Sequence, residues 1–145
     1  MARQTTDLIL VPTSVLPVGA TYPFVFPATT DGSPYWNDAK AYLVLTVSSV
    51  TSSPTVKPHM LVYDRASNAF FEVWAATSAQ SPTGAAVYAY VFLDNGFVPS
   101  ASGAIKQASQ VYLSPYMRLD LEIGGTGSVT ITAGFNRVNS VYAGV

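Results

Sequence analysis

The stretch "MRLDLEIGGTGSVTITAGF" (Met117–Phe135) decides the fold class of this chain. Its two halves alternate between apolar and other residues, and the glycine-rich "GGTG" (Gly124–Gly127) separates them. A period of two places successive side chains on opposite faces of an extended chain, which is typical of a half-buried β-strand. The inward residues are Met117, Leu119, Leu121 and Ile123 in the first half and Val129, Ile131, Ala133 and Phe135 in the second. We therefore expect two strands joined by a tight turn as a β-hairpin.

Short segments rich in β-branched and aromatic residues recur through the rest of the chain, separated by Gly, Pro, Ser and Asn turns. No window of a dozen residues has the 3.6-residue period of an amphipathic helix. The sequence thus predicts an all-β chain, folded as an antiparallel β-sandwich or a jelly-roll-like barrel. The expected strands are Ala41–Val50, His59–Asp64, Ala69–Ala75, Ala85–Asp94 and Gln110–Leu113.

Two features of the body suggest surfaces that meet a partner. The segment Ala85–Asp94 is apolar on both of its alternating faces, which indicates a central strand or a face buried against another protein. We expect Tyr88, Tyr90 and Phe92 to form that partner-binding face. Trp36, in "SPYWND", is the better candidate for an exposed aromatic residue, because Trp74 lies inside an apolar strand segment.

The N-terminal segment "LILVPTSVLPVGATYPFVFP" (Leu8–Pro27) is apolar but contains four prolines. Proline fixes φ and removes a hydrogen-bond donor, so this spacing disfavours both a helix and a central strand. We expect residues 1–30 to form an extended arm that docks on a sister subunit or on another neighbouring protein, and residues 31–145 to form the β-sandwich body. The arm residues expected to bind the partner are Leu8, Ile9, Leu10, Val11, Val15, Leu16, Tyr22, Phe24 and Phe26.

Charge is scarce in this chain of 145 residues. Only 10% of its residues are charged, against roughly 25% in ordinary globular domains. Because interface cores are depleted in charge and enriched in aromatic residues, we expect much of the surface to contact protein. The net charge is −1 and the basic residues are scattered, which argues against nucleic acid as a partner. No apolar run approaches the length of a membrane span, so no membrane partner is expected.

The sequence offers no convincing catalytic constellation. His59 is the only histidine and the chain has no cysteine, so the usual zinc ligand sets are missing. Asp120 and Glu122 share one strand face with Arg118, which is the pattern of a solvated charge ladder rather than of a glycosidase pair. Four aspartates near turns could bind calcium, but they lack the dense spacing of a calcium loop. They are Asp31, Asp38, Asp64 and Asp94. We expect no enzyme activity, no cofactor and no metal.

Four stretches resemble a class of small β-sandwich proteins from the heads of tailed bacteriophages. They are "AYLVLTVSSVTSSPTVKPHMLVYD" (Ala41–Asp64) followed by "FFEVWA" (Phe70–Ala75), "YMRLDLEIGGTGSVTITAGFNRV" (Tyr116–Val138), and the opening "MARQTT" (Met1–Thr6). The resemblance covers residues 36–138 and the first few residues. The sequence departs from the class at "DRASN" (Asp64–Asn68), where the class tends to carry Asp-Gly.

The resemblance implies a capsid decoration protein, also called an auxiliary or cementing protein. Such a structural virion protein would be made in the host cytoplasm and would bind the outer capsid surface. It would form a homotrimer and brace neighbouring copies of the major capsid protein. Two alternatives remain open at this point: a phage tail or connector protein, and a carbohydrate-binding module that uses Trp36 and surface tyrosines.

Overall fold

The computed structural model describes residues 3–26, 40–93, 105–110 and 116–142, with side chains for 9–26, 41–92, 106 and 116–136. These residues form strands, and no helix is found among them. The strands are β1 (Arg3–Pro17), β2 (Ala20–Val25), β3 (Lys40–Thr51), β4 (Pro54–Asp64), β5 (Ala69–Ala75), β6 (Ala86–Leu93), β7 (Ile105–Gln110), β8 (Met117–Gly125) and β9 (Ser128–Tyr142).

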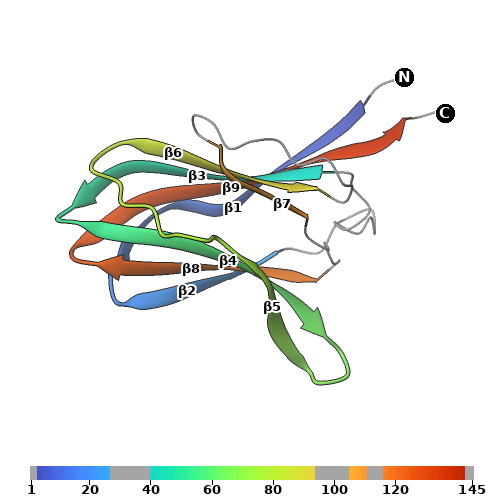
Figure 1. Cartoon of the computed structure of the whole chain (residues 1–145), viewed down its shortest axis with the longest axis horizontal. Helices are drawn as coiled ribbons and strands as arrows, with labels where there is room; N and C mark the ends of the chain where they lie inside the picture. The colour runs from blue at the N-terminus through green and yellow to red at the C-terminus, as the bar shows by residue number, and fades with distance from the viewer. Residues whose placement is uncertain (1–2, 27–39, 94–104, 111–115, 143–145) are drawn as a thin grey trace.

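The strands make two sheets that pack face to face (Figure 1). We call the five-stranded sheet, in the order β1-β9-β3-β6-β7, sheet A, and the four-stranded sheet, in the order β2-β8-β4-β5, sheet B. The β6–β7 pair is parallel, and the other pairs are antiparallel. The all-β sandwich expected from the sequence is therefore confirmed.

Three long runs of chain cross from one sheet to the other at the same end of the sandwich (Figure 1). Since they follow the order β1-β9-β3 in sheet A and β2-β8-β4 in sheet B, these six strands form one three-stranded sheet folded double. Backbone hydrogen bonds continue around the fold, where the N–H and C=O groups of Ser53 and Thr126 pair at 3.1 Å in both directions. The three corners are Val18–Gly19, Ser52–Ser53 and Thr126–Gly127.

The hairpin predicted over Met117–Phe135 is wrong, although both of its strands exist. β8 pairs with β2 and β4 in sheet B, whereas β9 pairs with β1 and β3 in sheet A. The glycine-rich turn is thus a corner between the sheets. Gly125 and Gly127 have positive φ, and their backbones closely approach those of Ser53 and Thr51. Both apolar sides still face inward, but they meet each other across the core.

The extended arm predicted over residues 1–30 is not confirmed. Arg3–Pro17 pairs along β9 as the edge strand of sheet A, and Ala20–Val25 pairs along β8 as the edge strand of sheet B. The prolines fit these positions because an edge strand has one side with no ladder bond to lose. Pro12 lies at a register shift of β1, and Pro23 is exposed on β2. The apolar stretch therefore covers the body of its own chain.

Aromatic rings cross the core and join the two sheets. Trp74 of β5 meets Tyr90 and Phe92 of β6 edge to face, at centroid distances of 5.4 and 4.8 Å. Phe135 of β9 continues the row, with Phe26 4.9 Å away. Trp74 is buried, as the sequence predicts.

Candidate protein-binding surface

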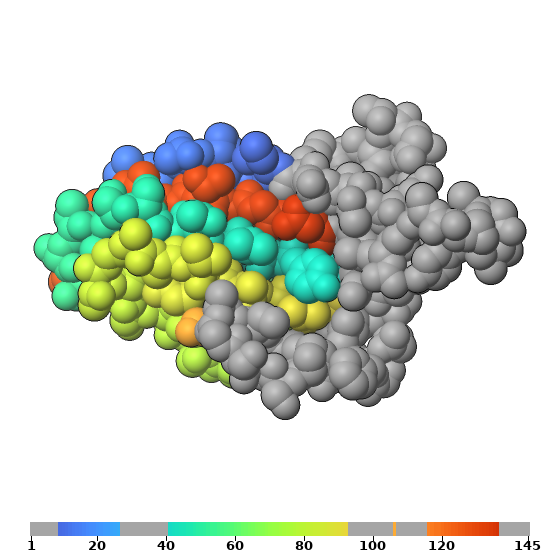
Figure 2. Space-filling view, turned by 90° about the horizontal axis from the view of Figure 1, so that it is seen from above, coloured from blue at the N-terminus to red at the C-terminus, as the bar shows by residue number. Residues whose placement is uncertain are grey.

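The outer side of sheet A carries no charged residue among the outward side chains that the structure describes on β1, β9, β3 and β6. Figure 2 shows these four strands side by side, in blue, red, teal and yellow. Most of the outward residues are Thr, Val, Ile, Ala or Ser. We call this surface the neutral face; it consists of Ile9, Thr13, Val15, Tyr42, Val44, Thr46, Ser48, Val87, Ala89, Thr130, Thr132, Gly134 and Asn136.

The strand register aligns these residues in rows across the sheet. One row runs from Ile9 through Gly134 and Val44 to Ala89. Thr132, Thr46 and Val87 form part of the next row, and the Thr13 hydroxyl lies 2.8 Å from that of Thr132. At one end of the neutral face, the register places Asp7 opposite Asn136 and Lys40 opposite Val138. The centre of sheet A is thus a continuous surface of short, mostly β-branched side chains.

The neutral face contains residues that are exposed although they are large and apolar. Ile9 is 71% exposed, Val15 63% and Val87 48%. Single exposed apolar residues are normal on a protein surface, but a patch that is contiguous across several strands indicates an interaction site. These three residues lie on two strands separated by β9 and β3, so the patch spans the width of the four strands.

The outer side of sheet B differs in chemistry. We call it the charged face; it carries Lys57, His59, Glu72, Arg118, Asp120 and Glu122. Its charges are largely paired within the chain. The guanidinium of Arg118 donates two hydrogen bonds to the carboxylate of Asp120, at 2.7 and 3.0 Å. Arg118 also lies over the ring of Phe70, 4.7 Å from its centroid.

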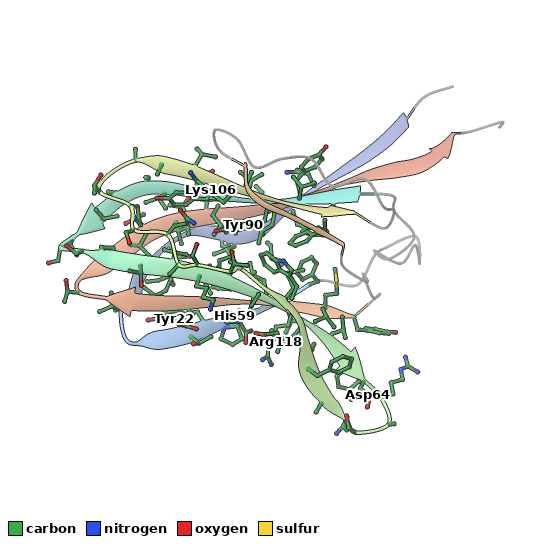
Figure 3. All side chains as sticks on the ribbon, viewed as in Figure 1. Tyr22, His59, Asp64, Tyr90, Lys106 and Arg118 are labelled. Atoms are coloured by element: carbon green, nitrogen blue, oxygen red, sulfur yellow. The ribbon has the colours of Figure 1, made fainter. Side chains whose placement is uncertain are left out.

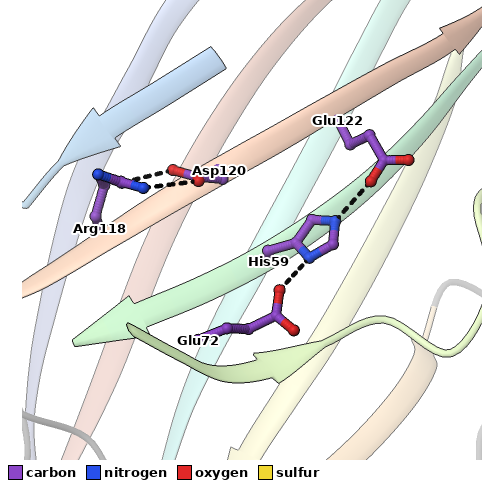
Figure 4. Close-up of polar contacts among 5 residues, drawn as sticks. All are labelled: His59, Glu72, Arg118, Asp120 and Glu122. Atoms are coloured by element: carbon purple, nitrogen blue, oxygen red, sulfur yellow. Dashed lines mark hydrogen bonds and ion pairs between the residues drawn. The ribbon is translucent and has the colours of Figure 1, made fainter. Parts of the chain in front are cut away.

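His59 lies between two carboxylates on the charged face (Figure 4). Its Nδ1 contacts Glu72 of β5, and its Nε2 lies 3.0 Å from Glu122 of β8. Since a carboxylate only accepts hydrogen bonds, His59 can donate to both only when both of its ring nitrogens are protonated. The contact joins three neighbouring strands of sheet B, and it gives the lone histidine a structural role.

The carboxylates predicted to form a ladder do share this face, each with its own cationic or histidine partner. Asp120 pairs with Arg118 and Glu122 with His59. No group of three or more His, Asp or Glu residues is placed to hold a metal ion in the part of the chain that the structure describes.

Asp64, one of the four aspartates considered for calcium, organises the β4–β5 turn instead. It accepts hydrogen bonds from the Ser67 hydroxyl at 2.7 Å and from the backbone N–H groups of Ser67 and Ala66. These hydrogen bonds stabilise the carboxylate and lower the pKa of Asp64. The Ser67 hydroxyl has the largest effect, and the N–H groups of Ser67 and Ala66 have smaller effects. Asp31, Asp38 and Asp94 lie outside the described residues.

The residues predicted to bind a partner through an arm divide into three groups. The first group lies in the core and comprises Leu10, Val11, Leu16 and Phe26. Tyr22 and Phe24 are half-buried against that core, and the Tyr22 hydroxyl donates to the Pro17 carbonyl at 2.7 Å. Ile9 and Val15 are exposed on the neutral face, whereas the side chain of Leu8 lies outside the described set. Among the arm residues whose side chains the structure describes, Ile9 and Val15 are therefore the two that are exposed to another protein.

The partner-binding face predicted on β6 points into the molecule. Tyr88, Tyr90 and Phe92 are buried, and the opposite side of the strand, with Val87, faces outward. Both sides of β6 are apolar, so alternation alone could not tell which side is the inner one. Trp36 lies outside the described residues.

Tyr90 is held between the two sheets (Figure 3). Its hydroxyl is buried and has no hydrogen-bond partner among the described residues. Burial and, to a smaller extent, the electrostatic influence of nearby Tyr88 together raise the pKa of Tyr90 to about 12. Burial also raises the pKa of Tyr88. Lys106 of β7 lies over the Tyr88 ring, 5.7 Å from its centroid.

The sequence reasoning missed the neutral face, although it contained the signal. In β9 the residues predicted to face inward alternate with Thr130 and Thr132, which must therefore face outward. In β3 the same alternation places Val44 and Thr46 outside. Comparing the outward residues of the strands with one another separates an uncharged set from the charged set of Arg118, Asp120 and Glu122.

No protein-family model matches the sequence, and no curated protein matches it. Within the described residues there is no helix whose length and apolar character would let it cross a membrane.

Proposed function

We propose that this chain is a structural protein of a tailed-phage particle that decorates the outside of the head and braces neighbouring capsid subunits. The observation that carries the proposal is the neutral face: a surface across four strands of the sandwich on which the described side chains carry no charge. The sequence resemblance over residues 36–138 supplies the phage setting.

An uncharged face suits contact with protein because no charge must be stripped of water when the face is covered. An unpaired charge that becomes buried costs several kcal/mol, by order of magnitude, whereas apolar surface gains about 25 cal/mol per Å². Valine and threonine also have restricted rotamers, so little side-chain entropy is lost on docking. A decoration protein could therefore bind with modest affinity per copy, and the many copies on one head would add their effects.

The two sides of the sandwich suggest an orientation on the particle. The neutral face would lie against protein, and the charged face, with His59, Arg118 and Glu122, would remain in solvent. The proposed partners are further copies of this chain and the major capsid protein, and assembly as a homotrimer stays a prediction from the resemblance.

Binding to heads tests this function. Heads of the phage that encodes the chain, prepared without it, would be mixed with the purified chain and sedimented. We expect the chain to pellet with the heads and to raise the temperature at which they release their DNA. Chain that stays in the supernatant, or that labels the tail rather than the head in electron micrographs, would overturn the proposal.

A further inference from the structure

We infer that the neutral face is a self-association surface on which a second copy of this chain packs face to face. The inference deepens the proposed function by naming a partner for the surface on which that function rests. It is testable on the purified chain alone, so its outcome is independent of whether the chain binds heads.

The first argument is the distribution of charge. A partner for the neutral face must itself present a flat surface without charge, because charged groups would lose their water there without gaining a new partner. Of the two outer sheet faces described here, the charged face does not qualify, because Arg118, Asp120, Glu122, His59 and Glu72 occupy it. The same neutral face of a second copy does qualify.

The second argument concerns hydrogen bonding. The polar groups at the centre of the neutral face are mainly hydroxyls, including those of Thr46, Thr130 and Thr132. A hydroxyl is both donor and acceptor, so rows of threonine can pair with identical rows in either orientation. The contact between the Thr13 and Thr132 hydroxyls shows this pairing within one chain. A self-complementary surface is what a symmetric pair of identical subunits requires.

The third argument is area. Four strands about 4.8 Å apart and about eight residues of about 3.4 Å each give a face of about 500 Å² in projection. Two copies would therefore bury about 1,000 Å² in total, which is the lower limit for a specific interface. The area predicts real but moderate association, so we expect it at tens of micromolar protein rather than at nanomolar protein.

A matched pair of valines provides the test. Val15 of β1 and Val25 of β2 are each 63% exposed on the edge strand of a different sheet. We expect the wild-type chain at about 50 µM, within the range typical of moderate interfaces, to show a mass above its 15.4 kDa monomer in light scattering. Val15→Glu and Val87→Glu should return the mass to 15.4 kDa, and Val25→Glu should not.

Circular dichroism and thermal melts of each variant separate loss of association from loss of folding. A wild-type chain that is monomeric at this concentration overturns the inference. So does an oligomer that Val15→Glu and Val87→Glu, both folded, leave intact. Binding of a monomeric chain to heads, lost in Val15→Glu, would overturn self-association while supporting the proposed function.

The absence of cysteine allows an independent test of the geometry. Thr46→Cys places a single thiol near the centre of the neutral face, and Val25→Cys places one on the opposite sheet. With mild oxidation we expect a disulfide-linked pair from Thr46→Cys at least tenfold faster than from Val25→Cys. Equal rates would contradict a face-to-face pair, and because both variants are nearly isosteric, folding is not expected to be disturbed.

Discussion

At the scale of single residues, the corner glycines fix how the sheet folds over. Gly127 has φ +87°, and a Cβ at this position would lie 1.9 Å from the Thr51 carbonyl oxygen. A Cβ at Gly125 would lie 2.2 Å from that of Ser53. No side chain fits there unless the backbones of two corners separate, so these glycines allow the close approach that joins the sheets.

Alanine substitutions at two glycines separate conformational strain from collision. Gly19 also has positive φ, +91°, but nothing lies within 4 Å of its Cβ position. We expect Gly19→Ala to lower the free energy of unfolding by about 1–2 kcal/mol through backbone strain alone. Gly127→Ala should lower it by about 3 kcal/mol or more, because overpacking adds to the strain. Urea unfolding measures both, and equal losses would contradict the packing described at this corner.

Burial of Tyr90 makes the stability of the fold depend on pH above pH 10. Its folded pKa of about 12 exceeds the ordinary value of 10.0. Below pH 10 the tyrosine is neutral in both the folded and unfolded states. Between pH 10 and 12 the unfolded chain loses the proton first, so stability falls as the pH rises, by up to about 2–3 kcal/mol at 1.36 kcal/mol per pKa unit.

Tyr90→Phe should remove this dependence and also the buried hydroxyl. We expect the variant to be more stable at pH 7 by about 1 kcal/mol, because an unpaired buried hydroxyl is costly. Its loss of stability above pH 10 should be shallower than that of the wild type, with Tyr88 contributing what remains. Thermal melts from pH 7 to 11.5 measure both effects. A less stable variant at pH 7 would show that the hydroxyl is bonded.

At the scale of elements, β1 and β2 are integral parts of the sandwich. Leu10, Val11 and Leu16 of β1 are buried, and each contributes about 1.5–3 kcal/mol on burial. Their sum is comparable to the whole stability of a small domain, about 5–15 kcal/mol. The N-terminal segment therefore behaves as core rather than as a detachable arm.

Deletion of residues 1–17 should prevent folding. The deletion removes three core side chains and the hydrogen-bonded neighbour of β9. We expect no cooperative thermal transition and aggregation of the truncated chain. The full-length control Ile9→Ala/Val15→Ala, which alters only exposed residues of β1, should melt within a few degrees of the wild type. A soluble, cooperatively melting truncated chain would restore the arm hypothesis.

Alternation in the sequence predicts strands and their inner sides but not their partners. The β5 segment Ala69–Ala75 matches its prediction, because aromatic and apolar composition after the turn residues "RASN" is a local signal. The apolar residues of Met117–Ile123 and Val129–Phe135 would face inward whether the two strands formed a hairpin in one sheet or met at a corner between two sheets. The alternation of apolar residues therefore cannot distinguish these two arrangements. The sequence predicts a loop where β7 is found, because its residues "IKQASQ" do not alternate between apolar and polar. For β1 and β2, prolines exclude a central strand but not an edge strand.

The candidate surface was predictable only in part. Low overall charge indicates a protein-binding surface, but placing that surface requires knowing which side of β6 faces inward. Tyr88, Tyr90 and Phe92 are large and apolar, so they fill the core, and the smaller Val87 and Ala89 remain outside. Of the arm residues, Ile9 and Val15 lie on the surface by virtue of their register with β9.

At the scale of the whole molecule, the sandwich has two outer faces of different chemistry. Paired charges keep the face of sheet B compatible with water, whereas sheet A presents threonine and aliphatic side chains. This division supports the proposed role in an assembly, in which one face is covered by protein and the other stays in solvent.

The structure of the assembled chain, determined by electron cryo-microscopy of heads that carry it, tests the central claim most directly. The account predicts that protein density covers the neutral face around Thr46, Thr132 and Val87, while His59 and Arg118 face solvent. A neutral face open to solvent, with contacts made through the charged face instead, would contradict it.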